Sequence, residues 1–176
     1  MQIKVSDIPE EGLAVEFTEP AGALSGLGDD MTAASDASAD FTLKKVGPTV
    51  FLKGTVKGTL DLTCSRCGRD YGYAVDAALS LDINSLDSLG DEEEKELRAG
   101  DMEVEFYTGD TLDLSGVLKE QLILQAPMKP LCSEGCLGLC QYCGQDLNIE
   151  KCACAPPIGH IGLAALGELL KDKEDK

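Results

Sequence analysis

Eight cysteines stand in two groups that lie far apart in the 176-residue sequence, and their spacing is that of metal ligands. The first group is the pair Cys64-Ser-Arg-Cys67, and the second is a dense cluster after residue 130. Cysteines separated by two or three residues can turn two sulfur atoms toward one ion, and a structural zinc site takes four ligands. The chain therefore predicts two zinc ions, bound by Cys64, Cys67, Cys132, Cys136, Cys140, Cys143, Cys152 and Cys154.

The order of the cysteines along the chain suggests how they are shared. One local site would use Cys140, Cys143, Cys152 and Cys154. A long-range site would then use Cys64, Cys67, Cys132 and Cys136. A different local site from Cys132, Cys136, Cys140 and Cys143 fits the spacing too, so the pairing stays open at this point.

Other uses of the thiols fit the sequence less well than zinc. Disulfides belong to secreted chains, and the N-terminus carries no apolar segment typical of a signal peptide. The iron–sulfur spacings of ferredoxins are absent. A redox Cys-x2-Cys pair opens a helix, whereas Cys64 and Cys67 are expected between two strands. A closed four-thiolate site leaves no position for chemistry, and His160 is the only histidine, so we expect no enzyme.

Charge and hydropathy limit the partners. The net charge of −17 opposes binding to nucleic acid or anionic lipid except through a focused patch, and favours basic partners. No apolar run approaches membrane-spanning length. With the missing signal peptide, this predicts an acidic cytoplasmic protein without a membrane partner.

One segment departs from the acidic average. Six bases and one acid, Asp61, lie between positions 44 and 69. A basic strip of this kind could contact RNA phosphates, or it could be a solvated strand face that protects a sheet edge. The candidate RNA-binding residues are Lys44, Lys45, Lys53, Lys57, Arg66 and Arg69.

Periodicity predicts an α+β fold in which a mainly antiparallel sheet carries one main helix and a cysteine-rich zinc-binding C-terminal segment. Strands are expected at the N-terminus, at 13–18, through 41–83 around Cys64 and Cys67, and at 102–108. Apolar residues alternate along one strand, where Gly54 and Gly58 mark bulges or close packing: Val50, Leu52, Val56, Leu60 and Leu62. Residues 20–39 read as a loop with a weak helix at 31–37, and 91–96 as a solvated acidic stretch.

The best helix is expected at 114–125, capped by Asp113 or Ser115. Its apolar stripe is widened by Ile123 and Leu124, which predicts a well-buried helix. Residues 1–126 would form a β-rich domain. Residues 127–176 would form a cysteine-rich knuckle with a helix at 162–171, packed as part of the same unit.

Three stretches resemble the YceD-like family of bacterial and plastid proteins. They are the segment from Pro130 to Asn148, which reads PLCSEGCLGLCQYCGQDLN and is followed by Cys152-Ala-Cys154; the pair Cys64-Ser-Arg-Cys67; and the N-terminal VSDIPEEG from Val5 to Gly12. The resemblance runs over nearly the whole chain. It implies a ribosome-biogenesis factor that supports accumulation of large-subunit ribosomal RNA.

The partner implied by the resemblance is ribosomal RNA or a large-subunit assembly intermediate. An alternative from a different class is an acidic, zinc-stabilised adaptor that binds a basic ribosomal protein or an RNA-processing enzyme. A thiol oxidoreductase is the remaining enzyme hypothesis.

Overall fold

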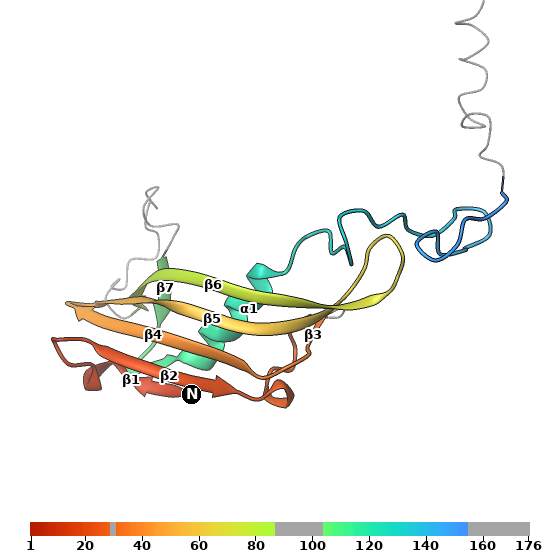
Figure 1. Ribbon diagram of the computed structural model, residues 1–176. Helices are drawn as coiled ribbons and strands as arrows, with labels where there is room; N and C mark the ends of the chain where they lie inside the picture. Colours follow the sequence, from red (N-terminus) through yellow and green to blue (C-terminus); the bar gives the residue numbers. More distant parts are fainter. Residues whose placement is uncertain (29–30, 87–103, 155–176) are drawn as a thin grey trace, which may run out of the picture. The chain divides into compact units, whose positions relative to one another are not determined.

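The computed structural model describes residues 1–28, 31–86 and 104–154, and the chain divides into two compact units, Met1–Glu134 and Gly135–Lys176 (Figure 1). The first unit contains every strand and helix described in this section. Its strands are β1 (Gln2–Lys4), β2 (Leu13–Glu19), β3 (Met31–Ala33), β4 (Ala37–Val46), β5 (Thr49–Thr63), β6 (Asp70–Ser85), β7 (Val104–Tyr107) and β8 (Thr111–Asp113). Two short 3-10 turns, Val5–Asp7 and Ala21–Ala23, and the helix α1 (Leu114–Gln125) complete it.

The main sheet has the order β2-β4-β5-β6-β7, and β3 pairs with β5 beside the end of β4. All its pairs are antiparallel except β6–β7, which is parallel. Strands β1 and β8 form a separate antiparallel pair. Figure 1 shows α1 against one face of the sheet. The expected α+β fold, with a mainly antiparallel sheet and one main helix, is confirmed.

The core lies between the sheet and α1. The alternation in β5 behaves as expected, and the following side chains are buried: Val50, Leu52, Val56, Leu60 and Leu62. Phe41 of β4 is fully buried, and its ring meets that of Phe17 edge to face with centroids 5.8 Å apart. Gly54 marks close packing: a Cβ atom there would lie 2.0 Å from the Asp40 carbonyl oxygen. The β5–β6 register runs unbroken past Gly54 and Gly58, so neither is a bulge in that ladder.

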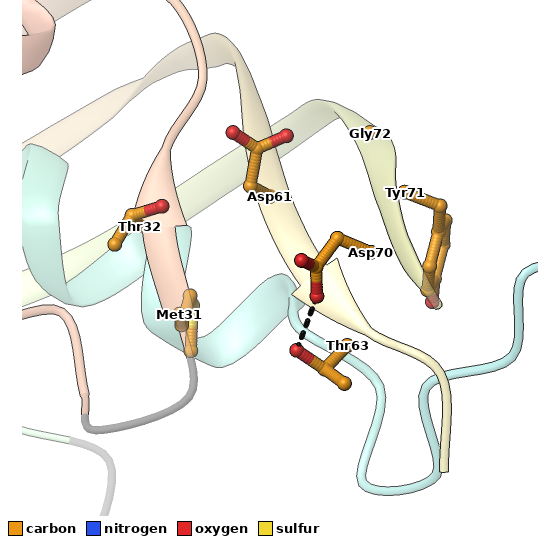
Figure 2. Close-up of a pocket in the computed structure, with 7 residues that line it drawn as sticks. All are labelled: Met31, Thr32, Asp61, Thr63, Asp70, Tyr71 and Gly72. Carbon is orange, nitrogen blue, oxygen red and sulfur yellow. Dashed lines mark hydrogen bonds between the residues drawn. The ribbon is translucent and has the colours of Figure 1, made fainter. Parts of the chain in front are cut away.

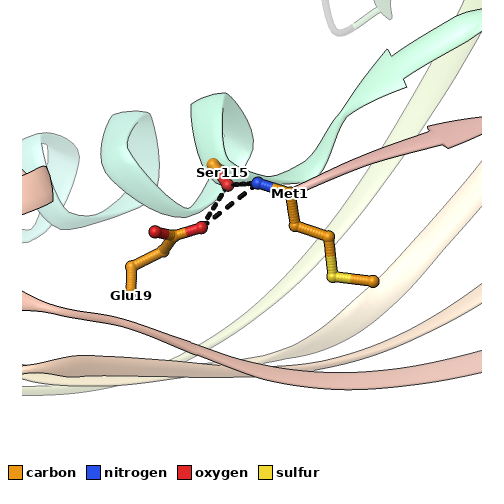
Figure 3. Close-up of polar contacts among 3 residues, drawn as sticks. All are labelled: Met1, Glu19 and Ser115. Carbon is orange, nitrogen blue, oxygen red and sulfur yellow. Dashed lines mark hydrogen bonds and ion pairs between the residues drawn. The ribbon is translucent and has the colours of Figure 1, made fainter.

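Helix α1 has the bounds expected from the sequence, but its capping differs. Asp113 holds the N-cap position without a capping side-chain bond. The backbone N–H groups of Leu114 and Ser115 instead donate to the Met1 carbonyl, at 3.0 and 3.3 Å. The Ser115 hydroxyl also bonds the Glu19 carboxylate, and the Met1 amino group contacts both (Figure 3). Two backbone donors at the helix N-terminus are therefore satisfied by Met1, just before β1, and Glu19 of β2 holds the Ser115 side chain.

The apolar face of α1 buries Leu114, Val117, Leu118 and Leu122. Leu124, which was expected to widen that face, is 70% exposed. Ile123, the other residue expected to widen it, is half-buried and packs against the core, so the prediction is wrong for Leu124 alone.

Residues 31–37 form no helix, contrary to the weak prediction: Met31–Ala33 pair with β5, and β4 begins at Ala37. Strand pairing outweighs the local helix propensity of this Ala-rich segment. The strand expected at 102–108 is found as β7. The acidic stretch 91–96, the helix expected at 162–171, and His160 lie outside the described residues.

The second unit is described over 135–154, where it consists of turns around one isolated β-bridge between Leu139 and Asp146. The Asn148 side chain organises the preceding turn. Its Oδ1 accepts from the Leu137 N–H at 2.7 Å, and its Nδ2 donates to Asp146 at 2.7 Å. The packing of residues 127–176 with the β-rich domain stays a prediction.

Candidate metal centres

The turn between β5 and β6 supplies the first two cysteines. β5 ends at Thr63 and β6 begins at Asp70, so Cys64 and Cys67 lie in the hairpin connection, as expected. The segment before Cys132 lies against this turn, because the N–H and the hydroxyl of Ser65 both donate to the Pro130 carbonyl, at 2.8 and 3.0 Å.

These contacts bring four sulfur atoms together. The sulfurs of Cys64, Cys67, Cys132 and Cys136 all lie within 4.8 Å of one another. The Sγ atoms of Cys67 and Cys132 are 3.7 Å apart. Four sulfurs placed tetrahedrally at about 2.3 Å from a zinc ion would be about 3.8 Å apart. The observed separation therefore fits a tetrahedral ion.

The second group lies wholly in the second unit. The sulfurs of Cys140, Cys143, Cys152 and Cys154 again lie within 4.8 Å of one another. The bridge between Leu139 and Asp146 brackets the turn that holds the first two of them. The two groups differ in exposure: Cys64, Cys67 and Cys136 of the first are buried, whereas Cys143 and Cys154 of the second are exposed.

The two Cys-x2-Cys turns repeat one backbone pattern. In the first, the Cys64 N–H donates to the Arg69 carbonyl at 2.8 Å and the Gly68 N–H to the Cys64 carbonyl at 2.9 Å. In the second, the Cys140 N–H donates to the Gln145 carbonyl at 2.8 Å and the Gly144 N–H to the Cys140 carbonyl at 2.9 Å. We call these turns, residues 64–69 and 140–145, the two knuckles.

A glycine follows the second cysteine in each knuckle and adopts positive φ, +70° at Gly68 and +72° at Gly144. L-residues rarely adopt this conformation, whereas glycine does so without steric cost. The cysteine spacing alone predicted the metal sites without these glycines. The signal was present, since both motifs read Cys-x2-Cys-Gly.

The electrostatics of each knuckle favour an ionised thiol. A hydrogen bond from the backbone N–H of Cys132 is the main cause that lowers the pKa of Cys64 to about 6. The backbone N–H of Cys143 does the same for Cys140, whose pKa is also about 6. The neighbouring Cys143 thiol raises the pKa of Cys154 to about 12. Adjacent thiols therefore resist joint ionisation until a cation is bound.

The donor set fits a metal ion. Both groups offer four sulfurs and no other ligand type, the composition used by structural zinc and by tetrahedral iron–sulfur sites. The structure assembles the same two sets of four that chain order suggested, and it separates the alternative set that mixed Cys132 and Cys136 with Cys140 and Cys143. Two groups of cysteines could thus hold metal ions.

The basic strip predicted from the sequence does not form one positively charged surface in the paired strands. Lys45 pairs with Val50, so it belongs to the apolar face of the sheet and not to the polar one. Lys57 forms an ion pair with Asp76 of β6 at 3.5 Å. In β2, β4, β5 and β6 the polar face carries three lysines against six carboxylates: Lys44, Lys53, Lys57, Glu16, Asp40, Asp61, Asp70, Asp76 and Asp82. Arg66 and Arg69 lie exposed in the first knuckle.

Fold and site together define a small sheet-based protein with two four-cysteine groups suited to metal. A family model described as "Large ribosomal RNA subunit accumulation protein YceD" matches residues 52–170, which include all eight cysteines. The chain belongs to the YceD family. The expected family resemblance is thereby confirmed.

One of the curated relatives that match the chain bears the name of this family. The chain is 26% identical over 146 residues to the chloroplastic "Large ribosomal RNA subunit accumulation protein YCED homolog 1" of Arabidopsis thaliana, covering 71% of this chain and 46% of that protein. It is 30% identical over 111 residues to uncharacterized proteins of Mycobacterium tuberculosis and Mycobacterium bovis, covering 63% of this chain and 51% of theirs. The chain thus spans about half the length of the curated relatives it matches. No solved structure matches it.

The described part of the chain contains no helix that is long and apolar enough to cross a membrane.

Proposed function

We propose that this chain is a non-enzymatic, cytoplasmic ribosome-biogenesis factor that supports the accumulation of large-subunit ribosomal RNA. The observation that carries the proposal is the family match, which covers both cysteine groups and whose description names this role. The Arabidopsis relative is named for the same role. Neither description names a reaction, and the cysteine groups resemble closed sites that leave no position for a substrate.

Two zinc ions would have a structural role in this factor. Zinc would cross-link the four thiolates of each group and offset the repulsion among them. The knuckle backbones would orient the sulfurs, since the N–H groups of Cys132 and Cys143 already stabilise one thiolate in each group. Because binding requires deprotonated thiols, metal affinity would fall as the pH is lowered.

A second candidate function follows from the charge of the sheet. The polar face carries twice as many carboxylates as lysines, so it favours a basic partner over RNA phosphate. In this alternative the chain is an adaptor that binds a basic ribosomal protein or an RNA-processing protein. Direct RNA contact would be left to the exposed side of the first knuckle, with Arg66 and Arg69.

The proposed function is tested by depleting the chain and measuring the ratio of large-subunit to small-subunit ribosomal RNA. We expect the ratio to fall and to be restored by the native chain. The variant Cys132→Ser should fail to restore it, whereas Ser133→Ala, an exposed neighbour outside the cysteine groups, should restore it. An unchanged ratio after depletion would refute the proposed function.

The two modes of action are separated by binding measurements with purified large-subunit ribosomal RNA. Charge reversal at Lys53, Lys57, Arg66 and Arg69 should abolish binding if these residues contact RNA directly. If the native chain does not bind purified RNA, the adaptor function is favoured.

A further inference from the structure

Among the described residues, strand β6 has no neighbour along most of one edge of the sheet. Its last four residues pair with β7, from Asp82 to Ser85. Within the described parts of the chain, residues 70–81 pair with β5 on one side and with no strand on the other. Twelve extended residues span about 40 Å, which is long for an open edge.

The open edge presents backbone groups at alternate residues. In an antiparallel ladder, every second residue bonds the partner strand and the residues between them point away. The Cys64 N–H donates to the Arg69 carbonyl, so Arg69 is one of the residues that bond toward β5. Every second residue after Arg69 therefore bonds β5 as well, and the residues between them point away. With the observed β5–β6 register, the residues that direct N–H and C=O groups away from β5 are Asp70, Gly72, Ala74, Asp76, Ala78 and Ser80.

The side chains along this edge leave the backbone accessible. Proteins usually protect an edge with lysines, prolines or bulges, and none of these occurs in residues 70–81. Of the six outward residues, Asp70 and Asp76 are acidic and the other four are small. On the other face, Tyr73, Leu79 and Leu81 remain half-buried at the margin of the core, so an added strand would cover them.

The polar face next to this edge is acidic, and a pocket opens where the edge begins. The pocket has a volume of about 540 Å³, and Asp61, Asp70 and Gly72 are among the residues that line it (Figure 2). Thr63 donates a hydrogen bond to Asp70 at 2.7 Å. The Asp61 backbone pairs with Thr32 of β3, and the Asp61 carboxylate has no hydrogen bond or ion pair with another described residue. The pocket therefore offers carboxylate oxygens to a cationic side chain.

We propose that residues 70–81 of β6 bind an extended, basic polypeptide segment of a partner protein by strand addition, with a basic side chain in the pocket at Asp61 and Asp70. This proposal deepens the adaptor form of the proposed function and rests on it. Backbone hydrogen bonds would supply affinity, and alternate side chains would supply specificity. The fitting segment alternates apolar residues, which cover Tyr73 and Leu79, with lysine or arginine on the acidic face.

The charges select this occupant over two others. RNA has no backbone that continues a β-ladder, and its phosphates would meet Asp61, Asp70 and Asp76. A second copy of this chain would bring another charge of −17 to the same edge. A basic segment is the occupant for which strand pairing and electrostatics act together.

The experiment uses the full metal-loaded chain and a twelve-residue peptide that alternates lysine and valine. A control peptide of the same sequence is N-methylated at four consecutive central residues, which keeps every charge but blocks hydrogen bonding on both edges. Fluorescence anisotropy at low and high salt measures binding. We expect the control peptide to bind at least about tenfold more weakly, because it loses several backbone hydrogen bonds.

Variants of the chain test the same contact from the other side. Ala78→Pro removes an outward N–H and should weaken binding by at least about tenfold, while the ladder to β5 is retained. Asp61→Asn should weaken binding less, and the effect should vanish at high salt. Glu10→Gln removes one charge at an exposed position in the turn before β2 and should bind as the native chain does.

Equal binding of the two peptides would show attraction by charge alone and overturn the proposal. Concentration-dependent dimerisation that Ala78→Pro abolishes, or binding of an RNA oligonucleotide that competes with the peptide at this edge, would also overturn it. Depletion of the chain can still lower the ribosomal RNA ratio in each of these cases. The edge proposal can therefore fail while the proposed function stands.

Discussion

The glycines of the two knuckles provide a sharp prediction, because they can be changed without removing a ligand. Gly68 and Gly144 have φ of +70° and +72°, and a Cβ at either position would meet no atom within 4 Å. Alanine therefore introduces backbone strain alone, about 1–2 kcal/mol for a non-glycine residue in this region. If the turn relaxes when metal leaves, zinc binding must supply this energy. The affinity of the altered site should then fall by about 5- to 30-fold.

The assay is chelator competition on the full chain, which reports the release of each metal ion. Gly68→Ala should weaken binding of the ion at the group that contains Cys64, and Gly144→Ala should weaken binding of the ion at the group that contains Cys140. Gly135→Ala is the matched control, since Gly135 lies beside Cys136 and has neither a positive φ nor an atom within 4 Å of the added methyl group. Gly68→Asn should recover part of the loss, because asparagine tolerates positive φ. If both alanine variants retain native affinity, the knuckles do not shape the metal sites as described.

Two further predictions concern the β-rich unit. Gly54→Ala would place a methyl group 2.0 Å from the Asp40 carbonyl oxygen, so it should lower the free energy of unfolding by about 3 kcal/mol or more. The control Gly72→Ala, on the exposed side of β6, should change the free energy of unfolding by less than about 0.5 kcal/mol. Desolvation, with a smaller contribution from Glu120, raises the pKa of Glu105, so the charged form destabilises the fold. Glu105→Gln should therefore raise the melting temperature at neutral pH, and the difference should shrink as the pH falls through the raised pKa of Glu105 and be lost below the ordinary glutamate pKa, about 4. Urea unfolding measures the glycine variants, and a Gly54→Ala chain as stable as the native chain would contradict the first prediction. Thermal melts at neutral pH and below about pH 4 measure Glu105→Gln, and a stabilisation that does not depend on pH would contradict the second.

Periodicity and spacing predicted the parts of the fold that depend on local sequence. The alternation of Val50, Leu52 and Val56 identified the core face of β5, and the stripe of α1 identified its buried side. The order of the cysteines along the chain suggested both groups of four, whereas their spacing alone left open the alternative set of Cys132, Cys136, Cys140 and Cys143.

The features that escaped prediction depend on contacts between distant segments. The Met1 carbonyl replaces the expected cap of α1, and residues 31–33 join β5 as a strand. The basic strip seemed cationic in sequence because its acidic neighbours lie on other strands. Only the register reveals that Lys57 faces Asp76 and that Lys45 turns to the opposite side.

The difference in exposure between the two cysteine groups has a consequence for their stability. Buried ligands such as Cys64 and Cys67 are protected from competing chelators and oxidants, whereas Cys143 and Cys154 are exposed. The second group is therefore expected to lose its metal first.

Metal content per chain tests the central claim most directly. Elemental analysis of the full chain, purified without added metal or chelator, should find two zinc ions per chain, one for each group of four sulfurs. Cys132→Ser and Cys152→Ser should each reduce the content to about one, because a structural site needs all four ligands. A native chain that carries no metal, or iron in place of zinc, would contradict the account.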